Sequence, residues 1–239
     1  MIDIHSLLAS YPRKRPPLTP EHEVIYEKEY KLNREGERAI EGLAKRLEGW
    51  MHGKIVTTTG STLELGAGTL NHLKHEKKLD KYDVVEPFVA LYQNSERLEQ
   101  VSTAYTQLSD ISGEKKYERI ISIAVLEHMT DLPRELALCC RHLVSDGVFQ
   151  AGIPSEGGFL WWMGWRSTTG LSYWLRNRLD YGTVMKHEHV NTAPEIISLV
   201  KYLFSDVKVC RFPTPMHNFS LYAYIEARNP IDARVTELL

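Results

Sequence analysis

The chain has 239 residues, 43% hydrophobic and 25% charged, which is enough for one full α/β core. Its formal net charge of −2 excludes the basic field that nucleic-acid-binding proteins use, and no apolar run approaches the ~20 residues of a membrane span or resembles a signal peptide. Because Cys139, Cys140 and Cys210 lack CxxC spacing, we expect reduced thiols in a soluble, cytoplasmic protein with no nucleic-acid partner and no integral membrane segment.

The N-terminal stretch "YPRKRPPLTP" combines proline with positive charge and predicts an extended lead-in. Its three consecutive cations, Arg13–Arg15, favour a solvated arm, with phosphate contact as the alternative. Thr19 and Pro20 suit a helix cap and a first helical position, so we expect a helix from Pro20 to Trp50, broken near Gly36 or Gly42. We assign residues 1–52 to this arm and helix.

From Ile55 to Ile153, short apolar runs alternate with segments that favour crossover helices, which is typical of a parallel, doubly wound sheet. A further helix, "TAPEIISLVKYLF", has Thr192 and Glu195 at the spacing of a capping box. The expected strands are "STLEL", "YDVVEP", "VSTAY", "RIISIAVL", "GVFQAGIP", "DVKVCRF" and "FSLYAYIEA".

These patterns predict an α/β fold with a doubly wound, mostly parallel, seven-stranded Rossmann-like sheet. The sheet domain covers residues 53–228, with an aromatic insert at 156–190 after the fifth strand and a C-terminal tail at 229–239. The periodicity of "RELALCCRHL" is that of a helix packed on the sheet, so Cys139 and Cys140 are expected in the core.

The turn "STLELGAGTLNHL" follows the first strand, where the ligand of such a sheet approaches the backbone. Gly66 and Gly68 permit a close approach and positive φ. Glu86 ends the second strand, where an acid accepts hydrogen bonds from ribose hydroxyls. The dinucleotide fingerprint would need glycine where Asn71 stands, and no YxxxK pair is present, so an NAD(P)-dependent oxidoreductase or epimerase becomes the alternative.

Four segments, "LELGAG", "VVEP", "LSDIS" and "ISIAVLEHMTDLP", resemble in order and spacing the motifs of class I S-adenosylmethionine-dependent methyltransferases, over about residues 55–155. The resemblance implies that Glu64, Gly66, Ala67 and Gly68 form a turn around the methionine and ribose of the cofactor, although Leu70 stands where the family often has a third small residue. It implies that Glu86 binds the ribose and that Pro87 and Phe88 flank the adenine. It also implies that Asp110 receives the adenine amino group with Ile111 beside the ring, and that Ala124 and Val125 line the site near the methionine.

Histidines are the candidate catalytic groups, because their charge changes near neutral pH. His128, after Glu127 at the end of the fourth strand, is expected to face the acceptor or to order its own loop. His187 and His189 in "MKHEHVN" alternate, which on an extended segment places both rings on one side and permits a metal interpretation. Without further ligands at fixed spacing we expect no metal, and one of the pair contacts the acceptor or both order the loop.

The insert at 156–190 holds Trp161, Trp162, Trp165 and Trp174 and is too long for an ordinary connection. It is expected to form a lid over the site, with part of it an amphipathic helix on which Leu171, Trp174, Leu175 and Leu179 form a stripe. The stripe either packs on the domain, walls an acceptor pocket, contacts a membrane interface or joins a second copy in a homodimer.

We therefore expect an enzyme that uses S-adenosylmethionine to methylate a small molecule or a glycan or nucleotide-sugar intermediate, on oxygen rather than nitrogen. The alternatives are the dinucleotide enzyme above and a non-catalytic, methyltransferase-like interaction module that docks through its aromatic insert.

Overall fold

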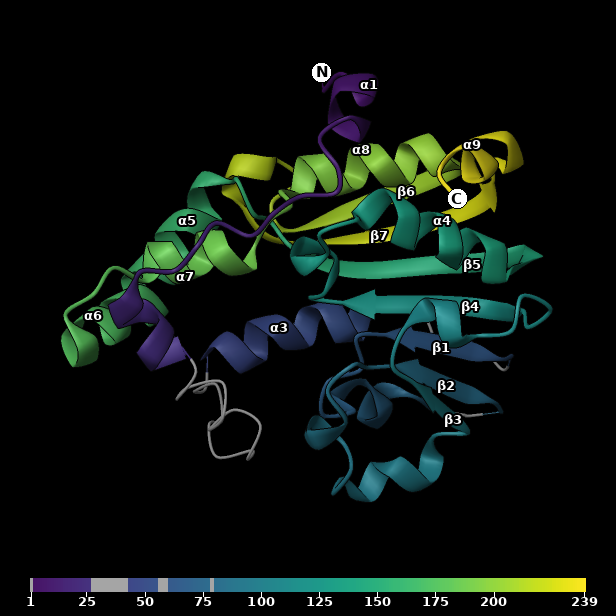
Figure 1. Ribbon diagram of the computed structural model, residues 1–239, viewed down its shortest axis with the longest axis horizontal. Helices are drawn as coiled ribbons and strands as arrows, with labels where there is room; N and C mark the ends of the chain where they lie inside the picture. Colours follow the sequence, from purple (N-terminus) through teal and green to yellow (C-terminus); the bar gives the residue numbers. More distant parts are fainter. Residues whose placement is uncertain (1, 27–42, 56–59, 78–79) are drawn as a thin grey trace.

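The computed structural model describes residues 2–26, 43–55, 60–77 and 80–239. Its centre is a seven-stranded sheet in the order β3-β2-β1-β4-β5-β7-β6 (Figure 1). All seven predicted strands are confirmed. They are β1 (Thr62–Leu65), β2 (Tyr82–Val85), β3 (Thr103–Tyr105), β4 (Tyr117–Ile123), β5 (Leu143–Pro154), β6 (Phe204–Pro213) and β7 (Ser220–Pro230).

The sheet is mixed rather than wholly parallel. Strands β1 to β5 pair in parallel, whereas β7 runs antiparallel to both β5 and β6. The expectation of a mostly parallel, Rossmann-like sheet is confirmed in this form. Because parallel strands end at the same edge, the carboxyl ends of β1, β2, β4 and β5 bring their following loops together.

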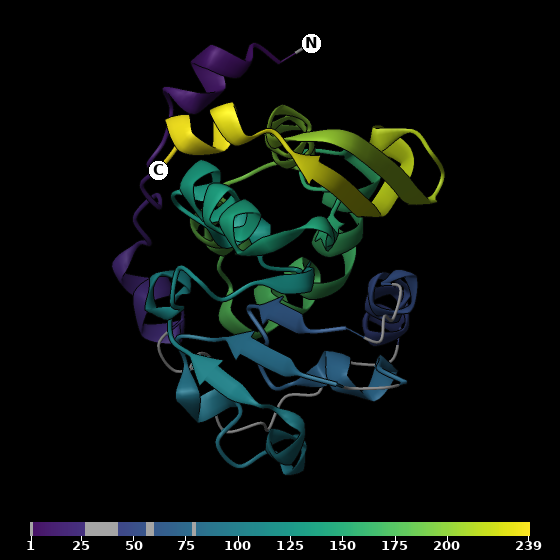
Figure 2. The ribbon, with the colours of Figure 1, turned by 90° about the vertical axis from the view of Figure 1, so that its right-hand side faces the viewer.

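Helices cover both faces of the sheet (Figure 2). On one face lie α1 (Ile4–Leu8), α4 (Leu132–His142), α8 (Ala193–Leu203) and α9 (Asp232–Glu237), and α3 (Leu43–Lys54) lies on the other. Cys139 and Cys140 are buried in α4, as predicted. Thr192 and Glu195 form the predicted capping box of α8. Among the described residues, no helix combines the length and apolar character needed to cross a membrane.

The predicted crossover helices are wrong for the first part of the sheet. Between β1 and β4 the described connections contain 3-10 turns: η1 (Asn71–His75), η2 (Val89–Leu91), η3 (Glu96–Gln100) and η4 (Leu108–Asp110). At the first connection, Leu70 takes a left-handed backbone with φ 61° while its side chain is fully buried, so the chain turns sharply before Asn71.

The N-terminal arm is attached to the domain, so the expectation of a solvated arm is wrong. Arg13 pairs with Glu195 at 2.7 Å, and its backbone N–H donates to the carbonyl of Thr130 at 2.7 Å. The Tyr11 hydroxyl donates to Asn191 Oδ1 at 2.6 Å. These partners lie more than 100 residues away in sequence, where local composition gives no signal. Residues 20–26 are helical as expected, and the predicted break near Gly36 or Gly42 lies outside the described residues.

The aromatic insert (residues 156–190) forms α5 (Phe159–Trp165), a π-helical turn η6 (Arg166–Gly170), α6 (Leu171–Asn177) and α7 (Tyr181–Glu188). It lies beyond the end towards which β4 points (Figure 1). The predicted helical stripe is confirmed for Leu171, Trp174 and Leu175, which are 47–54% exposed, so packing on the domain is the wrong interpretation for them. Leu179 follows the end of α6 and is partly buried. Tyr173 is the buried residue of α6.

Candidate functional site

The turn after β1 requires glycine. Gly66 has φ +70° and Gly68 φ +51°, both in the region that side chains with a Cβ rarely occupy. A Cβ at Gly66 would lie 2.3 Å from Val125 Cγ2, so the turn and the end of β4 are in close contact. The backbone of this turn is therefore held against the loop that follows β4.

Glu86 is held by the same turn. Its Oε2 accepts a hydrogen bond from the Gly68 N–H at 2.9 Å and its Oε1 accepts one from the Phe88 N–H at 2.9 Å. The residue is 5% exposed. Each oxygen keeps a further lone pair, so the carboxylate can accept two more hydrogen bonds from a diol.

Three other predicted cofactor residues lie beside this carboxylate or at the end of β4. Pro87 and Phe88 follow Glu86 on an exposed stretch. Ala124 has φ +54°, an unfavourable backbone for alanine, and its N–H donates to the Gly152 carbonyl at 2.8 Å. Such strain tends to occur at functional sites, where the surrounding structure maintains it.

Four predicted residues serve the fold in ways that the motif alone did not indicate. Glu64 is buried and accepts a hydrogen bond from the Tyr82 hydroxyl at 2.8 Å, and burial raises its pKa to about 8. Ala67 and Ile111 are buried in the core. Asp110 is exposed, and hydrogen bonds from Gln107 and Thr106 lower the pKa of its carboxyl.

A cluster of carboxylates and histidines faces the end of β4. Glu127 and His128 lie in the 3-10 turn η5 (Leu126–His128), and His189 caps the C-terminus of α7. Potential ligand atoms of these three residues all lie within 4.8 Å of one another, and the two histidine rings meet edge to face at 4.8 Å. Glu127 is buried, and no group in the described part of the chain hydrogen-bonds its Oε2.

His187 does not join this cluster. Residues 181–188 form a helix rather than the extended segment that would place both histidines on one side. The Nδ1 of His187 lies 2.7 Å from the Pro16 carbonyl, so this residue holds the N-terminal arm. The structure thus brings together Glu127, His128 and His189 from the predicted catalytic set.

Glu188 anchors His128 and was not predicted. His128 Nδ1 lies 3.0 Å from the Glu188 carbonyl and 3.3 Å from Glu188 Oε2. Burial opposes protonation of His128, but the contacts with Glu188 and the charge of Glu127 outweigh it and raise its pKa. Burial also opposes ionisation of Glu188, yet hydrogen bonds from His128 and Tyr26 and the charge of Arg15 hold its pKa at about 2.

Glu156 orients His189 and was also missed. His189 Nδ1 lies 2.7 Å from Glu156 Oε2, which also accepts a hydrogen bond from Trp161 Nε1 at 2.6 Å. Burial opposes ionisation of Glu156, but the contacts with His189 and Trp161 lower its pKa. With Nδ1 engaged, Nε2 is the His189 atom left to exchange a proton. An acid two residues after the end of the fifth strand was a usable signal for Glu156.

The donors of Glu127, His128 and His189 are of types that bind divalent ions. The expectation of no metal remains a prediction.

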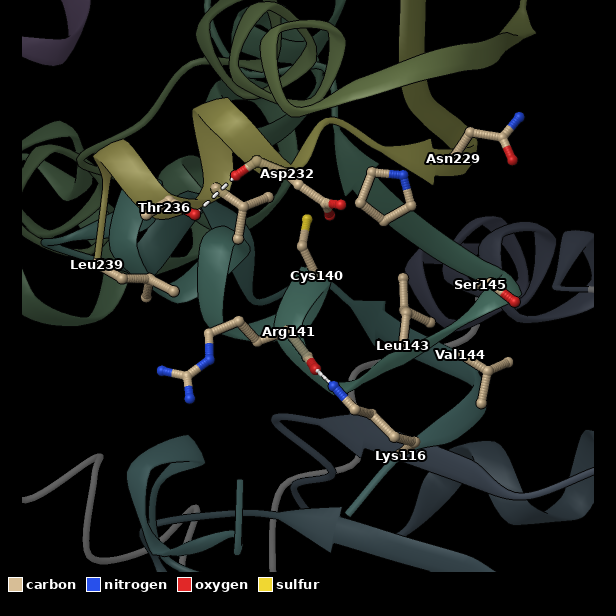
Figure 3. Close-up of a pocket in the computed structure, with 12 residues that line it drawn as sticks. Lys116, Cys140, Arg141, Leu143, Val144, Ser145, Asn229, Asp232, Thr236 and Leu239 are labelled. Atoms are coloured by element: carbon tan, nitrogen blue, oxygen red, sulfur yellow. Dashed lines mark hydrogen bonds between the residues drawn. The ribbon is translucent and has the colours of Figure 1, made fainter. Parts of the chain in front are cut away.

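A hollow of about 790 Å³ lies at the opposite edge of the sheet from the candidate site (Figure 3). Its lining includes Leu143, which begins β5, together with Arg141 at the end of α4 and Asp232 at the start of α9. It therefore lies at the amino end of β5, away from the glycine turn and the histidines.

The fold is that of class I S-adenosylmethionine-dependent methyltransferases. A Thermotoga maritima methyltransferase, described as a possible histamine N-methyltransferase, gives a TM-score of 0.54 at 16% identity and covers 87% of this chain and 97% of its own. The Burkholderia thailandensis 1,6-didemethyltoxoflavin-N1-methyltransferase, with S-adenosylhomocysteine bound, gives 0.54 at 17% identity, covering 90% and 92%. The plantazolicin methyltransferase BpumL, with the same ligand, gives 0.52 at 13% identity, covering 72% and 77%.

A scan against protein-family models and a search of curated proteins give no match. At these identities the structural likeness establishes the fold, and the predicted resemblance is confirmed at that level.

Proposed function

We propose that the protein is an S-adenosylmethionine-dependent methyltransferase that methylates a hydroxyl of a small molecule. The observation that carries this proposal is one juxtaposition at the carboxyl edge of the sheet. Val125 contacts the glycine turn that holds Glu86, and two residues later Glu127 begins the histidine–carboxylate cluster. The turn that would bind adenosine thus contacts the same loop after β4 that carries the groups suited to proton transfer.

The residues of the turn fit this cofactor. Gly66 and Gly68 offer an open backbone, and Glu86 is oriented by two N–H groups to accept from the ribose hydroxyls. Phe88, 40% exposed, and the ionised Asp110 suit the adenine ring and its amino group. S-Adenosylmethionine, when bound, supplies a methyl group activated by the sulfonium charge. Asn71, in place of the third dinucleotide glycine, argues against NAD.

His189 is the group we assign as general base. Glu156 fixes its Nδ1, which leaves Nε2 to accept the proton of an acceptor hydroxyl as the new carbon–oxygen bond forms. This carboxylate also stabilises the imidazolium that results. His128 contacts Glu188 through its Nδ1, and its raised pKa favours the protonated form, which cannot accept a proton, so we assign it the role of orienting its neighbours.

A second candidate reaction, methylation of an amine, is favoured by the carboxylates. Glu127, Glu156 and Glu188 surround the two histidines, and Glu127 Oε2 is buried and unpaired within the described part of the chain. An ammonium group would supply the missing donor. An amine must lose its proton before it attacks, so His189 would be needed for this acceptor as well.

The acceptor is proposed to enter beneath the aromatic insert, which acts as a lid. Trp161 stacks over His189 with ring centroids 6.4 Å apart and contacts Tyr222 edge to face. A flat aromatic wall beside the base suits a ring-containing acceptor such as a sugar of a glycan or nucleotide-sugar intermediate. Residues 53–228 would form the catalytic domain, with residues 1–52 as its N-terminal extension.

Calorimetry with S-adenosylhomocysteine and with NAD tests the cofactor. We expect binding of the former alone, and tight binding of NAD alone would contradict the proposal. Binding of neither ligand would favour an interaction module.

Transfer of a labelled methyl group to sugar, amine and hydroxyl-bearing metabolite fractions then identifies the acceptor. Activity on hydroxyl compounds that is lost in His189→Gln supports O-methylation, and activity confined to amines supports the second candidate.

A further inference from the structure

Two successive helices of the aromatic insert each present an apolar face to solvent. Phe159, Trp162 and Met163 on α5 are 43–54% exposed. Leu171, Trp174 and Leu175 on α6 are 47–54% exposed. Both sets have the spacing i, i+3 and i+4, so each set lies on one side of its helix. This exposure is therefore organised, unlike the scattered apolar residues of ordinary surfaces.

The part of the insert that carries these two faces is positively charged. Between Gly157 and Leu179 the sequence has three arginines, Arg166, Arg176 and Arg178, and no acidic residue, although the chain as a whole carries −2. The Arg166 guanidinium lies over the Trp162 ring at 5.3 Å, and that of Arg178 lies over the Trp174 ring at 4.8 Å. Cations are thus held directly beside the exposed aromatic rings.

We propose that the exposed apolar faces of α5 and α6 dock on an anionic phospholipid bilayer. Helices that lie in the membrane interface combine Trp, Phe and Leu on one side with arginine beside them, because the rings enter the headgroup region while the cations meet lipid phosphates. The charge of the face is complementary to such a surface.

A symmetric pairing with a second copy fits the face less well. A two-fold interface brings the same patch of both copies together, so it would oppose arginine to arginine across a segment without acidic residues. A bilayer has no such conflict. It would also bring the acceptor entrance at Trp161 close to the membrane, because α5 holds both Trp161 and the exposed face.

Co-sedimentation with vesicles tests the proposal. We expect the protein to bind phosphatidylcholine vesicles that contain phosphatidylglycerol, with a blue shift of tryptophan fluorescence, and to bind pure phosphatidylcholine vesicles about tenfold or more weakly. The variant Trp174→Ser/Leu175→Ser should lose about tenfold or more of the affinity. The variant Arg166→Gln/Arg178→Gln should lose about 25-fold on the anionic vesicles.

A matched control removes one exposed leucine and one exposed cation far from the insert, Leu239→Ser/Lys208→Gln, and should bind like the unaltered protein. Unchanged S-adenosylhomocysteine affinity and circular dichroism of every variant would separate lipid binding from folding and from the proposed methyl transfer.

Equal binding to both kinds of vesicle, no binding to the anionic ones, or unaltered binding by the Trp174 variant would overturn the proposal. A concentration-dependent dimer that the Trp174 variant abolishes, without vesicle binding, would also overturn it and assign the face to a second copy.

Discussion

Two sides of the candidate site are assembled over different sequence distances. On the cofactor side (Gly66, Gly68, Glu86 and Phe88), hydrogen bonds join residues 2 and 18 positions apart. On the acceptor side (Glu127, His128, Glu156, Glu188 and His189), contacts with His128 and Glu188 come from Arg15, 113 positions from His128, and from Tyr26, 162 positions from Glu188.

This difference separates two physical tasks. A turn that binds a constant ligand needs little beyond glycine backbone and one oriented acid, so a short motif encodes it. Proton transfer to a variable acceptor needs oriented side chains, and here distant segments orient them. Changes on the cofactor side should therefore alter ligand affinity, and changes on the acceptor side should alter turnover.

The largest effect is expected at His189. The change His189→Gln should lower kcat about 10²- to 10⁴-fold, because the general base is lost, while S-adenosylhomocysteine affinity stays within about twofold. Steady-state kinetics and calorimetry measure the two quantities. His187→Gln is the control, since this ring contacts the arm. An equal loss of kcat in both variants would refute the assignment.

The next largest effect is expected at Gly66, where a substitution should lower the affinity for S-adenosylhomocysteine. In Gly66→Ala the new Cβ would meet Val125, and the positive φ would be strained, so S-adenosylhomocysteine affinity should fall about 100-fold. Gly53→Ala, a helical glycine with open space around it, should leave affinity unchanged. Calorimetry that finds the two variants alike would remove the turn from the ligand site.

At Glu86 we expect a smaller loss of affinity. Glu86→Ala removes a charged acceptor of two ribose hydrogen bonds, so S-adenosylhomocysteine affinity should fall about 30-fold, by roughly 2 kcal/mol. Water can replace the carboxylate as the hydrogen-bond acceptor of the Gly68 and Phe88 N–H groups, so the free energy of unfolding should change less than the binding free energy. Unchanged affinity would show that the acid does not bind the ribose.

Arg13 tests whether the arm belongs to the acceptor side. Arg13→Ala breaks the half-buried pair with Glu195 and should lower the free energy of unfolding by about 1 to 2 kcal/mol, with S-adenosylhomocysteine affinity unchanged. Chemical denaturation measures the stability. Lys14→Ala, at the exposed neighbour, serves as control. A loss of S-adenosylhomocysteine affinity in Arg13→Ala would show that the arm also affects the cofactor side, which would contradict the separation of the two sides.

A pH effect on stability is expected at His52 in α3. His52 Nδ1 lies 3.0 Å from His72 Nδ1, and burial, with the charges of His72 and His75, lowers the pKa of His52 to about 3. In the unfolded chain His52 takes up a proton near pH 6.5, so between about pH 3 and pH 6.5 the unfolded state carries one more proton at His52 than the folded state does. The contribution of His52 to stability is therefore present above about pH 6.5 and falls by about 1.4 kcal/mol per pH unit as the pH drops. Chemical denaturation at about pH 6 and about pH 4.5 should show that the free energy of unfolding of His52→Asn depends less on pH than that of the unaltered protein.

The sequence was sufficient for the sheet and for most of the cofactor side. Strands with buried apolar runs, the capping box at Thr192 and the turn at Gly66 rest on local patterns, which the structure preserves. At the first connection Leu70 adopts a left-handed backbone instead of continuing into a crossover helix, which no propensity for leucine indicates.

The acceptor side was predictable only in its parts. His128 and His189 were found as residue types, but their carboxylate partners Glu188 and Glu156 were not, because pairing depends on tertiary contacts. The exposed stripe on α6 shows the same limit, since periodicity predicts an apolar face without stating what covers it.

The attachment of the N-terminal arm has a consequence for the order of synthesis. Arg13 leaves the ribosome 182 residues before its partner Glu195. At ordinary elongation rates the arm waits about 10 to 35 seconds for the surface on which it docks. The arm is thus made well before the surface that holds it, and the environment of His128 and Glu188 is complete only after α8 has been synthesised.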